Sequence, residues 1–404
     1  MIARLTPRPL RGEIAALPSK SQAHRALICA ALAKGRTRIA CGRTGQDVEA
    51  TVRCLRALGA DISYDGRVYA VTPIRTVPRV ATLDAGESGS TLRFLLPVAC
   101  ALGANATFLL RGRLAKRPME PLWSALVRHG AVLERDEKSI RTGGKLTGSD
   151  FSLAANVSSQ FLSGILFALC AMGGGSLHLE TAMESAPYFD MTCDALKRFG
   201  AKIIQEESTL RLVPGSLQSP GELAVEGDWS NAAFWLCADR IGGSRLTVSG
   251  LDPDSRQGDR IAPALIETIC AGNAEINCGQ IPDLAPPLAA LAAFCPGRTV
   301  FTGAARLRLK ESDRIESTVR MLRGLGASAG ALPDGLWVEG QRSLPGGTVD
   351  ACGDHRIAMA AAIAAAGCCG SVTIRGAEAT EKSYAGFWED YVNLGGGLTW
   401  EEEP

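Results

Sequence analysis

Two kinds of helical segment recur along the chain, and they differ in how their apolar positions are spaced. The first kind is an amphipathic stretch that ends at a glycine and is followed by an extended segment, as in RCLRALGADI, ALVRHGAVLE and CDALKRFGAKI. The glycines that end these stretches are Gly59, Gly130, Gly200, Gly272, Gly326 and Gly395, at steps of 71, 70, 72, 54 and 69 residues. One glycine after a helix is commonplace, but six at near-constant spacing indicate tandem duplication of an α/β unit.

The second kind of segment is a helix that is apolar on nearly every side and follows a short polar loop. Its copies open at PSKS, ESGS, SSQ, EGDWS, PD and GD. The polar residues predict N-caps, and a helix that is apolar all round is buried. Short runs such as SVTIRG and RTVFTG lie between the helices and predict strands. The pattern therefore predicts an α/β fold of six units, each with one buried helix.

Composition narrows the class of protein. The chain has 404 residues, which suggests two or three domains, and its 46% hydrophobic and 21% charged content is that of a globular protein. A net charge of +1 gives no bulk attraction for nucleic acid or for anionic membranes. The longest apolar runs, such as 357–369, are too short to span a bilayer, and the N-terminus has no signal-like segment. The 13 cysteines form no CxxC pair, so we expect a cytoplasmic protein in a reducing compartment.

Cations stand at several predicted helix starts. Lys20, Ser21 and Arg25 open the first apolar helix, where free backbone N–H groups would complete an anion cradle; a capped surface helix explains the same residues equally well. The turn 86–91, with Arg93 just beyond it, could approach a ligand closely or be an ordinary turn. The loop 158–160 suits plain capping as well as a hydroxylated or phosphorylated ligand.

The C-terminal half repeats this arrangement. His355 and Arg356 open an apolar helix at its positive end, a placement that costs stability unless an anionic ligand offsets it. Taken singly, Asp283 predicts an N-cap, and the charged run 310–314 predicts a solvated helix face. Lys382 and the pair Lys116–Arg117, taken singly, predict charges at the protein surface. Taken together, seven cations imply a ligand with several negative charges, such as phosphate plus carboxylate: Lys20, Arg25, Arg117, Lys310, Arg314, Arg356 and Lys382. Asp283 and Glu311 would be the acid–base pair among them.

Ten segments in one order, from about Leu17 to about Tyr391, are similar to the 5-enolpyruvylshikimate-3-phosphate synthase family. They are LPSKSQAHRALICAALA, ESGSTLRF, KRPM, SSQFLSGILFAL, ESAPYFDMT, EGDWSNAAF, IPDLAPPLAAL, LRLKESDRIE, GDHRIAMAAA and EKSY. The resemblance implies two globular domains, each of three βαβαββ units with buried parallel helices. Residues 1–18 would join 227–404 in a discontinuous domain that carries mainly phosphoenolpyruvate ligands and acid–base groups, and 19–226 would hold mainly shikimate 3-phosphate. Because the implied ligands come from both domains, we expect the domains to close on binding.

The resemblance also implies the reaction and its residues. The 5-hydroxyl of shikimate 3-phosphate attacks phosphoenolpyruvate to give a tetrahedral ketal, which then loses phosphate. Glu311 would donate and recover the proton at C3, Asp283 would take the hydroxyl proton, and Lys20 would stabilise charge on the phosphate bridge. The implied ligands of shikimate 3-phosphate are Lys20, Ser21, Arg25, Ser158, Ser159, Gln160, Ser185, Tyr188, Asp283 and Lys310. Those of phosphoenolpyruvate are Lys20, Gly89, Arg117, Gln160, Glu311, Arg314, His355, Arg356 and Lys382.

We expect no metal, no organic cofactor, no nucleic-acid or membrane partner, and a monomer. Two positions depart from the family pattern: Glu87 stands where Asn is frequent, and Arg306 where Asn or Glu is commoner. The nearest rival is the UDP-N-acetylglucosamine enolpyruvyl transferase family, which places a reactive Cys before its RP motif; this chain has no Cys between Cys100 and Cys170. A non-catalytic anion-binding homologue would be expected to lack Asp283 or Glu311. An RNA 3′-phosphate cyclase is disfavoured by the near-neutral charge and the absence of a nucleotide loop.

Overall fold

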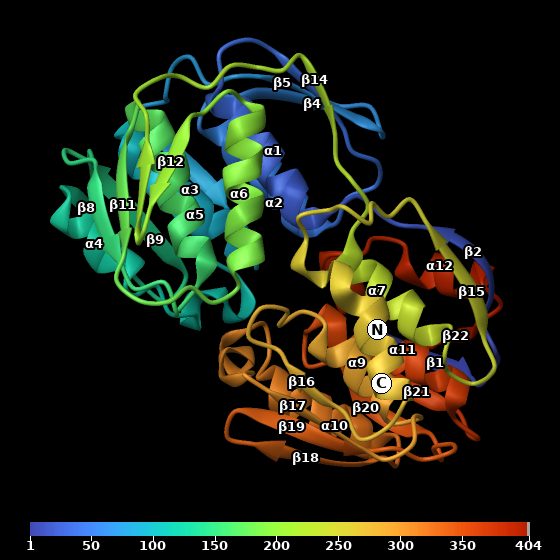
Figure 1. The fold of residues 1–404 in the computed structure, drawn as a ribbon. Helices are drawn as coiled ribbons and strands as arrows, with labels where there is room; N and C mark the ends of the chain where they lie inside the picture. Colours follow the sequence, from blue (N-terminus) through green and yellow to red (C-terminus); the bar gives the residue numbers. More distant parts are fainter. Residues whose placement is uncertain (402–404) are drawn as a thin grey trace. The chain divides into compact units, whose positions relative to one another are not determined.

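The computed structural model describes residues 1–401, and the chain folds into two compact units (Figure 1). Unit 1 consists of Met1–Leu17 and Glu226–Pro404, and unit 2 of Pro18–Val225. The sequence predicts domain boundaries after residues 18 and 226. In the structure the units divide after Leu17 and after Val225, one residue earlier in each case. Each unit has its own hydrophobic core. Within the described residues, no helix is both long enough and apolar enough to cross a bilayer.

Unit 2 contains three sheets and six α-helices. Its strands are β3 (Thr37–Ala40), β4 (Asp61–Tyr64), β5 (Val68–Thr72), β6 (Val80–Asp84), β7 (Asn105–Leu109), β8 (Ala131–Arg135), β9 (Ser139–Gly144), β10 (Asp150–Leu153), β11 (Gly175–Leu179), β12 (Ile203–Glu206), β13 (Thr209–Leu212) and β14 (Glu222–Ala224). Its helices are α1 (Lys20–Leu32), α2 (Gln46–Ala57), α3 (Gly89–Leu102), α4 (Leu122–Arg128), α5 (Ser159–Met172) and α6 (Ala186–Arg198), with the 3-10 helix η1 (Gly112–Lys116).

Unit 1 has the same kinds of element. Its strands are β1 (Ile2–Thr6), β2 (Arg11–Ala15), β15 (Arg245–Ser249), β16 (Glu275–Asn277), β17 (Arg298–Thr302), β18 (Ser328–Leu332), β19 (Gly335–Glu339), β20 (Gly347–Asp350), β21 (Val372–Arg375) and β22 (Gly397–Glu401). Its α-helices are α7 (Trp229–Ala238), α8 (Ala262–Cys270), α9 (Ala285–Ala292), α10 (Arg314–Gly324), α11 (His355–Ala364) and α12 (Phe387–Asn393). Its 3-10 helices are η2 (Gly258–Ile261), η3 (Ala305–Leu309), η4 (Ala365–Gly367) and η5 (Ala377–Lys382).

One strand-pairing pattern recurs in both units: a parallel pair is extended by two antiparallel strands. The complete sheets are β14-β3-β5-β4, β6-β7-β9-β8, β10-β11-β13-β12, β16-β17-β19-β18 and β20-β21-β1-β22, and the parallel pair β15-β2 stands alone. The N-terminal strands β1 and β2 therefore complete sheets of unit 1. No hairpin follows Gly272, the fourth of the six glycines, and the chain passes directly into β16, which explains the short 54-residue step. The predicted six α/β units are confirmed, one of them in reduced form.

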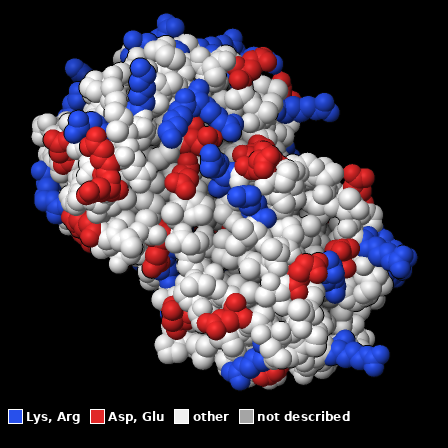
Figure 2. Space-filling view, viewed as in Figure 1, with Lys and Arg blue, Asp and Glu red and all other residues white. Residues whose placement is uncertain are grey.

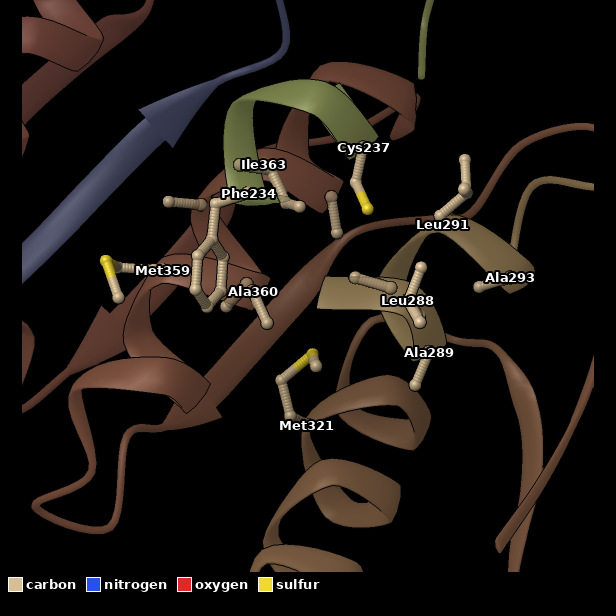
Figure 3. Packing of buried hydrophobic residues seen from close by; sticks show 14 of the residues in the cluster. Phe234, Cys237, Leu288, Ala289, Leu291, Ala293, Met321, Met359, Ala360 and Ile363 are labelled. Atoms are coloured by element: carbon tan, nitrogen blue, oxygen red, sulfur yellow. The ribbon is translucent and has the colours of Figure 1, made fainter. Parts of the chain in front are cut away.

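The six apolar helices are buried, as predicted. They are α1, α3 and α5 in unit 2 and α7, α9 and α11 in unit 1. Figure 3 shows α7, α9, α10 and α11 contributing side chains such as Phe234, Leu288, Met321 and Met359 to one packed interior. The amphipathic helices end as the pattern predicts, because all six of their terminal glycines have φ between 81° and 106°, a conformation that favours glycine.

The predicted N-caps are confirmed at five of the six buried helices, and α9 is the exception. Ser19, Ser88, Ser158, Asp228 and Asp354 accept hydrogen bonds from backbone N–H groups of the first turn. Helix α9 instead begins after Leu284 with prolines in its first turn and has no side-chain cap. The prediction that Asp283 caps this helix is therefore wrong, because its carboxylate is engaged by arginines.

Helices α3 and α5 approach each other closely at one glycine. Pro97 lies inside α3 and has no N–H group to bond the carbonyl of Arg93, four residues earlier. Gly164 of α5 packs against this point, where an added Cβ would lie 2.2 Å from the Arg93 carbonyl oxygen and 3.0 Å from Pro97 Cγ. Only a residue without a Cβ fits there without moving a helix.

We therefore predict that Gly164→Ala destabilises unit 2 by about 2 to 3 kcal/mol, because the methyl group must push two buried helices apart. In thermal unfolding, the midpoint should fall by roughly 5 to 10 °C. Gly215→Ala is a matched control, since its Cβ would meet nothing closer than 3.9 Å. Equal midpoints for the two variants would contradict the close approach of α3 and α5.

Candidate active site

In unit 1, the predicted site residues gather at the N-terminal ends of three helices. Asp283 precedes α9, the run 310–314 leads into α10, and residues 354–356 open α11. Contacts between the side chains of these segments join them into one cluster. Because α9 and α11 are buried along their length, their first turns are where such polar groups can be accommodated.

Arg314 is the centre of this cluster and is only 2% exposed. Its Nη1 donates to Asp283 Oδ1 at 2.8 Å, its Nε donates to Asp354 Oδ2 at 2.8 Å, and its Nη2 lies 3.5 Å from Glu311 Oε2. Burial lowers the pKa of Arg314, but the surrounding carboxylates, Asp354 first, outweigh that effect and raise the pKa above its ordinary value. The guanidinium is therefore a permanent buried charge. The prediction that residues 310–314 form a solvated face is wrong at Arg314.

Asp283 lies between three cations. Besides Arg314, Arg356 Nη2 donates to its Oδ2 at 3.0 Å, and Lys310 Nζ lies 3.7 Å from its Oδ1. The backbone carbonyl of Asp283 also accepts from Arg356 Nη1 at 3.1 Å. The carboxylate is thus fixed in orientation, although it stands in a loop before α9.

Glu311 and His355 form the second feature of the cluster, with Glu311 Oε2 2.7 Å from His355 Nδ1. Burial by itself raises the pKa of Glu311, but His355, Arg314 and Lys382 together outweigh it and hold that pKa well below its usual range. Lys382 is 9% exposed at the end of η5, so the interpretation of this lysine as a surface charge is also wrong.

Glu311, Asp354 and His355 offer ligand atoms within 4.8 Å of one another, which is a spacing that a metal ion could use. The electrostatics disfavour a cation there. Arg314 donates to both oxygens of Asp354, at 2.8 and 3.2 Å, and the site faces the positive end of α11. These oxygens already bond a guanidinium, so the residues present do not fit a metal ion.

In unit 2, Lys20 and Arg25 both lie in the N-terminal part of α1. Arg25 is 2% exposed; its Nε donates to Thr192 Oγ1, and its Nη groups donate to the carbonyls of Ser21 and Tyr188 at 2.6 Å. Burial lowers its pKa to about 10, so it remains charged at neutral pH. Its hydrogen-bond partners within residues 1–401 include no carboxylate, and such a site favours an anionic ligand.

The first turns of α3 and α5 are tied together through Gln160. Arg93 Nη1 donates to Gln160 Oε1 at 2.8 Å, and Gln160 Nε2 donates to Ser90 Oγ at 2.9 Å.

Arg117 lies against the start of α3. Its Nη1 is beside Gly89, where an added Cβ would be 2.5 Å from that nitrogen. Arg117 is 9% exposed, so interpreting Lys116–Arg117 as a solvated pair is wrong for Arg117, while Lys116 is exposed.

The serine loops are placed as capping residues. Ser158 accepts from the backbone N–H of Gln160 at 3.3 Å, and Ser159, the first residue of α5, is buried. Ser185 precedes α6, is buried and has φ 55°, a conformation rare for serine. Tyr188 follows in the first turn of α6, where its carbonyl accepts from Arg25. Capping and ligand binding are thus compatible at these positions.

The structure adds residues that the sequence analysis did not assign to the site: Asp47, Arg93 and Asp354. Asp47 contacts Lys20, Arg93 holds Gln160, and Asp354 holds Arg314. A carboxylate in the first turn of a helix is a weak signal by itself, because such residues are common there for dipole reasons alone.

The two residues that depart from the family pattern, Glu87 and Arg306, each lie against a glycine. Glu87 lies against Gly112, and Arg306 Nη2 donates to the carbonyl of Gly279 at 3.3 Å.

The carboxylates of this cluster predict how stability depends on pH. Glu311 and Asp354 both have a pKa below their ordinary values of 4.5 and 3.8, so the stability that they contribute is present above those values and is lost as the pH falls. We predict that the thermal midpoint is level from pH 7 to about pH 5 and falls steeply below about pH 4.5. Calorimetry should show a shallower fall for Glu311→Gln than for Glu316→Gln, whose carboxylate is 47% exposed. Identical pH profiles for the two variants would contradict the assignment.

Comparison with known proteins gives the following similarities. The family model described as EPSP synthase (3-phosphoshikimate 1-carboxyvinyltransferase) matches residues 5–391. The chain is 37% identical to a 3-phosphoshikimate 1-carboxyvinyltransferase of Clostridium acetobutylicum and 36% identical to that of Clostridium kluyveri, in each case over 97% of both chains. An EPSP synthase structure from Acinetobacter baumannii superposes with a TM-score of 0.79 at 25% identity, over 99% of this chain and 100% of the other. The enolpyruvyl transferase NikO from Streptomyces tendae, at 19% identity and a TM-score of 0.77 over 100% and 99% of the two chains, shares the fold.

Proposed function

The chain belongs to the EPSP synthase family, and from this premise we propose how its two clusters divide the chemistry. The chain transfers the enolpyruvyl group of phosphoenolpyruvate to the 5-hydroxyl of shikimate 3-phosphate and releases phosphate, a step of the shikimate pathway in aromatic amino acid biosynthesis. The observation that carries the division of roles is that each unit holds its own buried arginines near helix N-termini, which lie beside carboxylates in unit 1 and, at Arg25, beside a hydroxyl group and two carbonyls in unit 2.

Unit 2 supplies the ligands of shikimate 3-phosphate. Arg25, a buried cation whose hydrogen bonds go to a hydroxyl and two carbonyls, suits its anionic groups. The N-terminus of α5 adds N–H groups and hydroxyls suited to a phosphate. The proposed set in this unit is Lys20, Ser21, Arg25, Ser158, Ser159, Gln160, Ser185 and Tyr188, with Asp283 and Lys310 contributed by unit 1.

Phosphoenolpyruvate takes the remaining cations. Arg314 and Arg356 are planar and rigidly held, a geometry suited to a carboxylate, and Arg117 and Lys382 suit a phosphate. Lys20 would stabilise the charge on the bridging oxygen as phosphate leaves. The proposed set is completed by Gly89, Gln160, Glu311 and His355.

Glu311 is the group that gives a proton to C3 and takes it back. At 2.7 Å from His355 Nδ1, it forms a buried pair that can share one proton. Bound phosphoenolpyruvate would add negative charge among the cations that now lower its pKa, which favours the protonated acid. Asp283, fixed by Arg314 and Arg356, is the base for the 5-hydroxyl, and the product of addition is a tetrahedral ketal.

The reaction is proposed to need no metal and no organic cofactor, since buried arginines and lysines carry the neutralising charge. A monomer without nucleic-acid partners and a cytoplasmic location remain expectations from the sequence. The UDP-N-acetylglucosamine enolpyruvyl transferase alternative is not favoured, because the family model and the curated relatives are those of the shikimate enzyme.

Phosphate release by the purified protein tests the function. We predict release only when phosphoenolpyruvate and shikimate 3-phosphate are both present, at a rate that EDTA leaves unchanged. Replacing shikimate 3-phosphate with UDP-N-acetylglucosamine should abolish release. Activity with the nucleotide sugar, or a loss in EDTA that a divalent ion restores, would contradict the proposal.

Gly89→Ala tests the placement of Arg117. Its Cβ would lie 2.5 Å from Arg117 Nη1, so the guanidinium must move, and we predict that KM for phosphoenolpyruvate rises about tenfold or more while KM for shikimate 3-phosphate changes little. The control is Gly143→Ala, whose Cβ would meet nothing closer than 3.8 Å. An unchanged KM for phosphoenolpyruvate in steady-state kinetics would remove Arg117 from the proposed set.

A further inference from the structure

Lys20 is held by a carboxylate from a neighbouring helix. Asp47 Oδ2 lies 3.1 Å from Lys20 Nζ, and their side chains are 10% and 18% exposed. Lys20 is the first residue of α1, and Asp47 lies in the first turn of α2. This ion pair is therefore shielded from water, unlike the exposed pairs elsewhere in unit 2, such as Asp194 with Arg198.

The two helix dipoles act on these charges in opposite directions. A lysine at the start of α1 meets the positive end of the helix, which disfavours a cation. A carboxylate in the first turn of α2 is favoured by the same effect. Asp47 is thus stabilised where it lies and offsets the unfavourable position of Lys20.

A buried hydrogen-bond network fixes Asp47 relative to α1 and α3. Thr91 Oγ1 donates to the carbonyl of Asp47 at 3.3 Å and lies 2.7 Å from Thr51 Oγ1, which in turn lies 2.7 Å from His24 Nδ1. His24, Thr51 and Thr91 are fully buried. Burial lowers the pKa of His24 to about 3, so the network keeps one protonation state at neutral pH. The N-terminal parts of α1, α2 and α3 are thereby tied together.

We propose that Asp47 is the positioning residue for Lys20: it holds the ammonium group in the orientation from which Lys20 reaches its substrates. Asp47 acts through Lys20 and does not itself contact the reacting atoms. The proposal rests on the proposed function, since that function assigns Lys20 to both substrates. It adds a residue that determines how well Lys20 is oriented before either substrate arrives.

Kinetics of Asp47→Asn test the proposal, because the amide keeps the shape of the side chain and removes its charge. We expect kcat/KM for phosphoenolpyruvate to fall about 10- to 100-fold, with a thermal midpoint within about 3 °C of the unmodified protein. Asp47→Glu should recover part of the loss, since it restores the carboxylate. The matched control is Asp194→Asn, which removes one carboxylate from an exposed pair at 2.9 Å in the same unit and should leave the kinetics unchanged.

A double-mutant cycle with Lys20→Ala separates positioning from a general structural role. If Asp47 acts through Lys20, Asp47→Asn should cause no further loss of kcat/KM in the Lys20→Ala background. The same fold-loss in both backgrounds would overturn the proposal and leave the proposed function standing. An unchanged rate for Lys20→Ala alone would overturn the role of Lys20 in the proposed function, and the proposal with it.

The division of the loss between kcat and KM provides a readout that a structural role would not move. Because Asp47 acts only through Lys20, Asp47→Asn and Lys20→Ala should divide their loss of kcat/KM in the same way between kcat and KM for phosphoenolpyruvate. Asp47→Glu should recover kcat and KM in the same proportion. Losses that the two variants divide differently between kcat and KM would overturn the proposal.

Discussion

A helix that is buried on every side can offer polar groups to a ligand only at its ends, and this constraint governs both units. In α1, α3, α5, α7, α9 and α11 the side chains along the length are taken up by apolar packing. The unpaired N–H groups of their first turns are the polar points that remain, and the caps and cations collect there. The same packing that stabilises the fold thus decides where the site can be.

Cations at such positions are unfavourable unless anions accompany them. The protein supplies carboxylates for this purpose: Asp47 for Lys20, Asp354 for Arg314, and Asp283 for Arg356. Net charge gives no guide to these places. Unit 2 has 25 Lys and Arg against 18 Asp and Glu, a charge of +7, and unit 1 has 18 against 24, a charge of −6. Figure 2 shows charges of both signs scattered over the face in view. The anion site proposed in the negatively charged unit depends on where arginines are buried, not on how many there are.

Much of the fold could be predicted from the sequence because its signals are local. The glycine at the end of each amphipathic helix needs only its own φ angle, and burial of the apolar helices follows from their composition. The site residues were predictable only as a set. Arg117 and Lys382 look like surface charges one at a time, and Asp283 looks like an N-cap. Asp47 lies 27 residues from Lys20 along the chain, so no local pattern could reveal that they form an ion pair.

The fixed position of Asp283 has a consequence for the chemistry proposed here. Its two carboxylate oxygens accept from Arg314 and Arg356, so the side chain is held in one orientation. A proton taken up by Asp283 would weaken both ion pairs, and the arginines would therefore favour its release. Glu311, beside His355 and Arg314, has the opposite task. Asp283 would have to be charged when a turnover begins, whereas Glu311 would have to be protonated when it gives a proton to C3 and would be protonated again when it takes that proton back. The addition and the elimination together would therefore return both carboxylates to the states from which the next turnover begins.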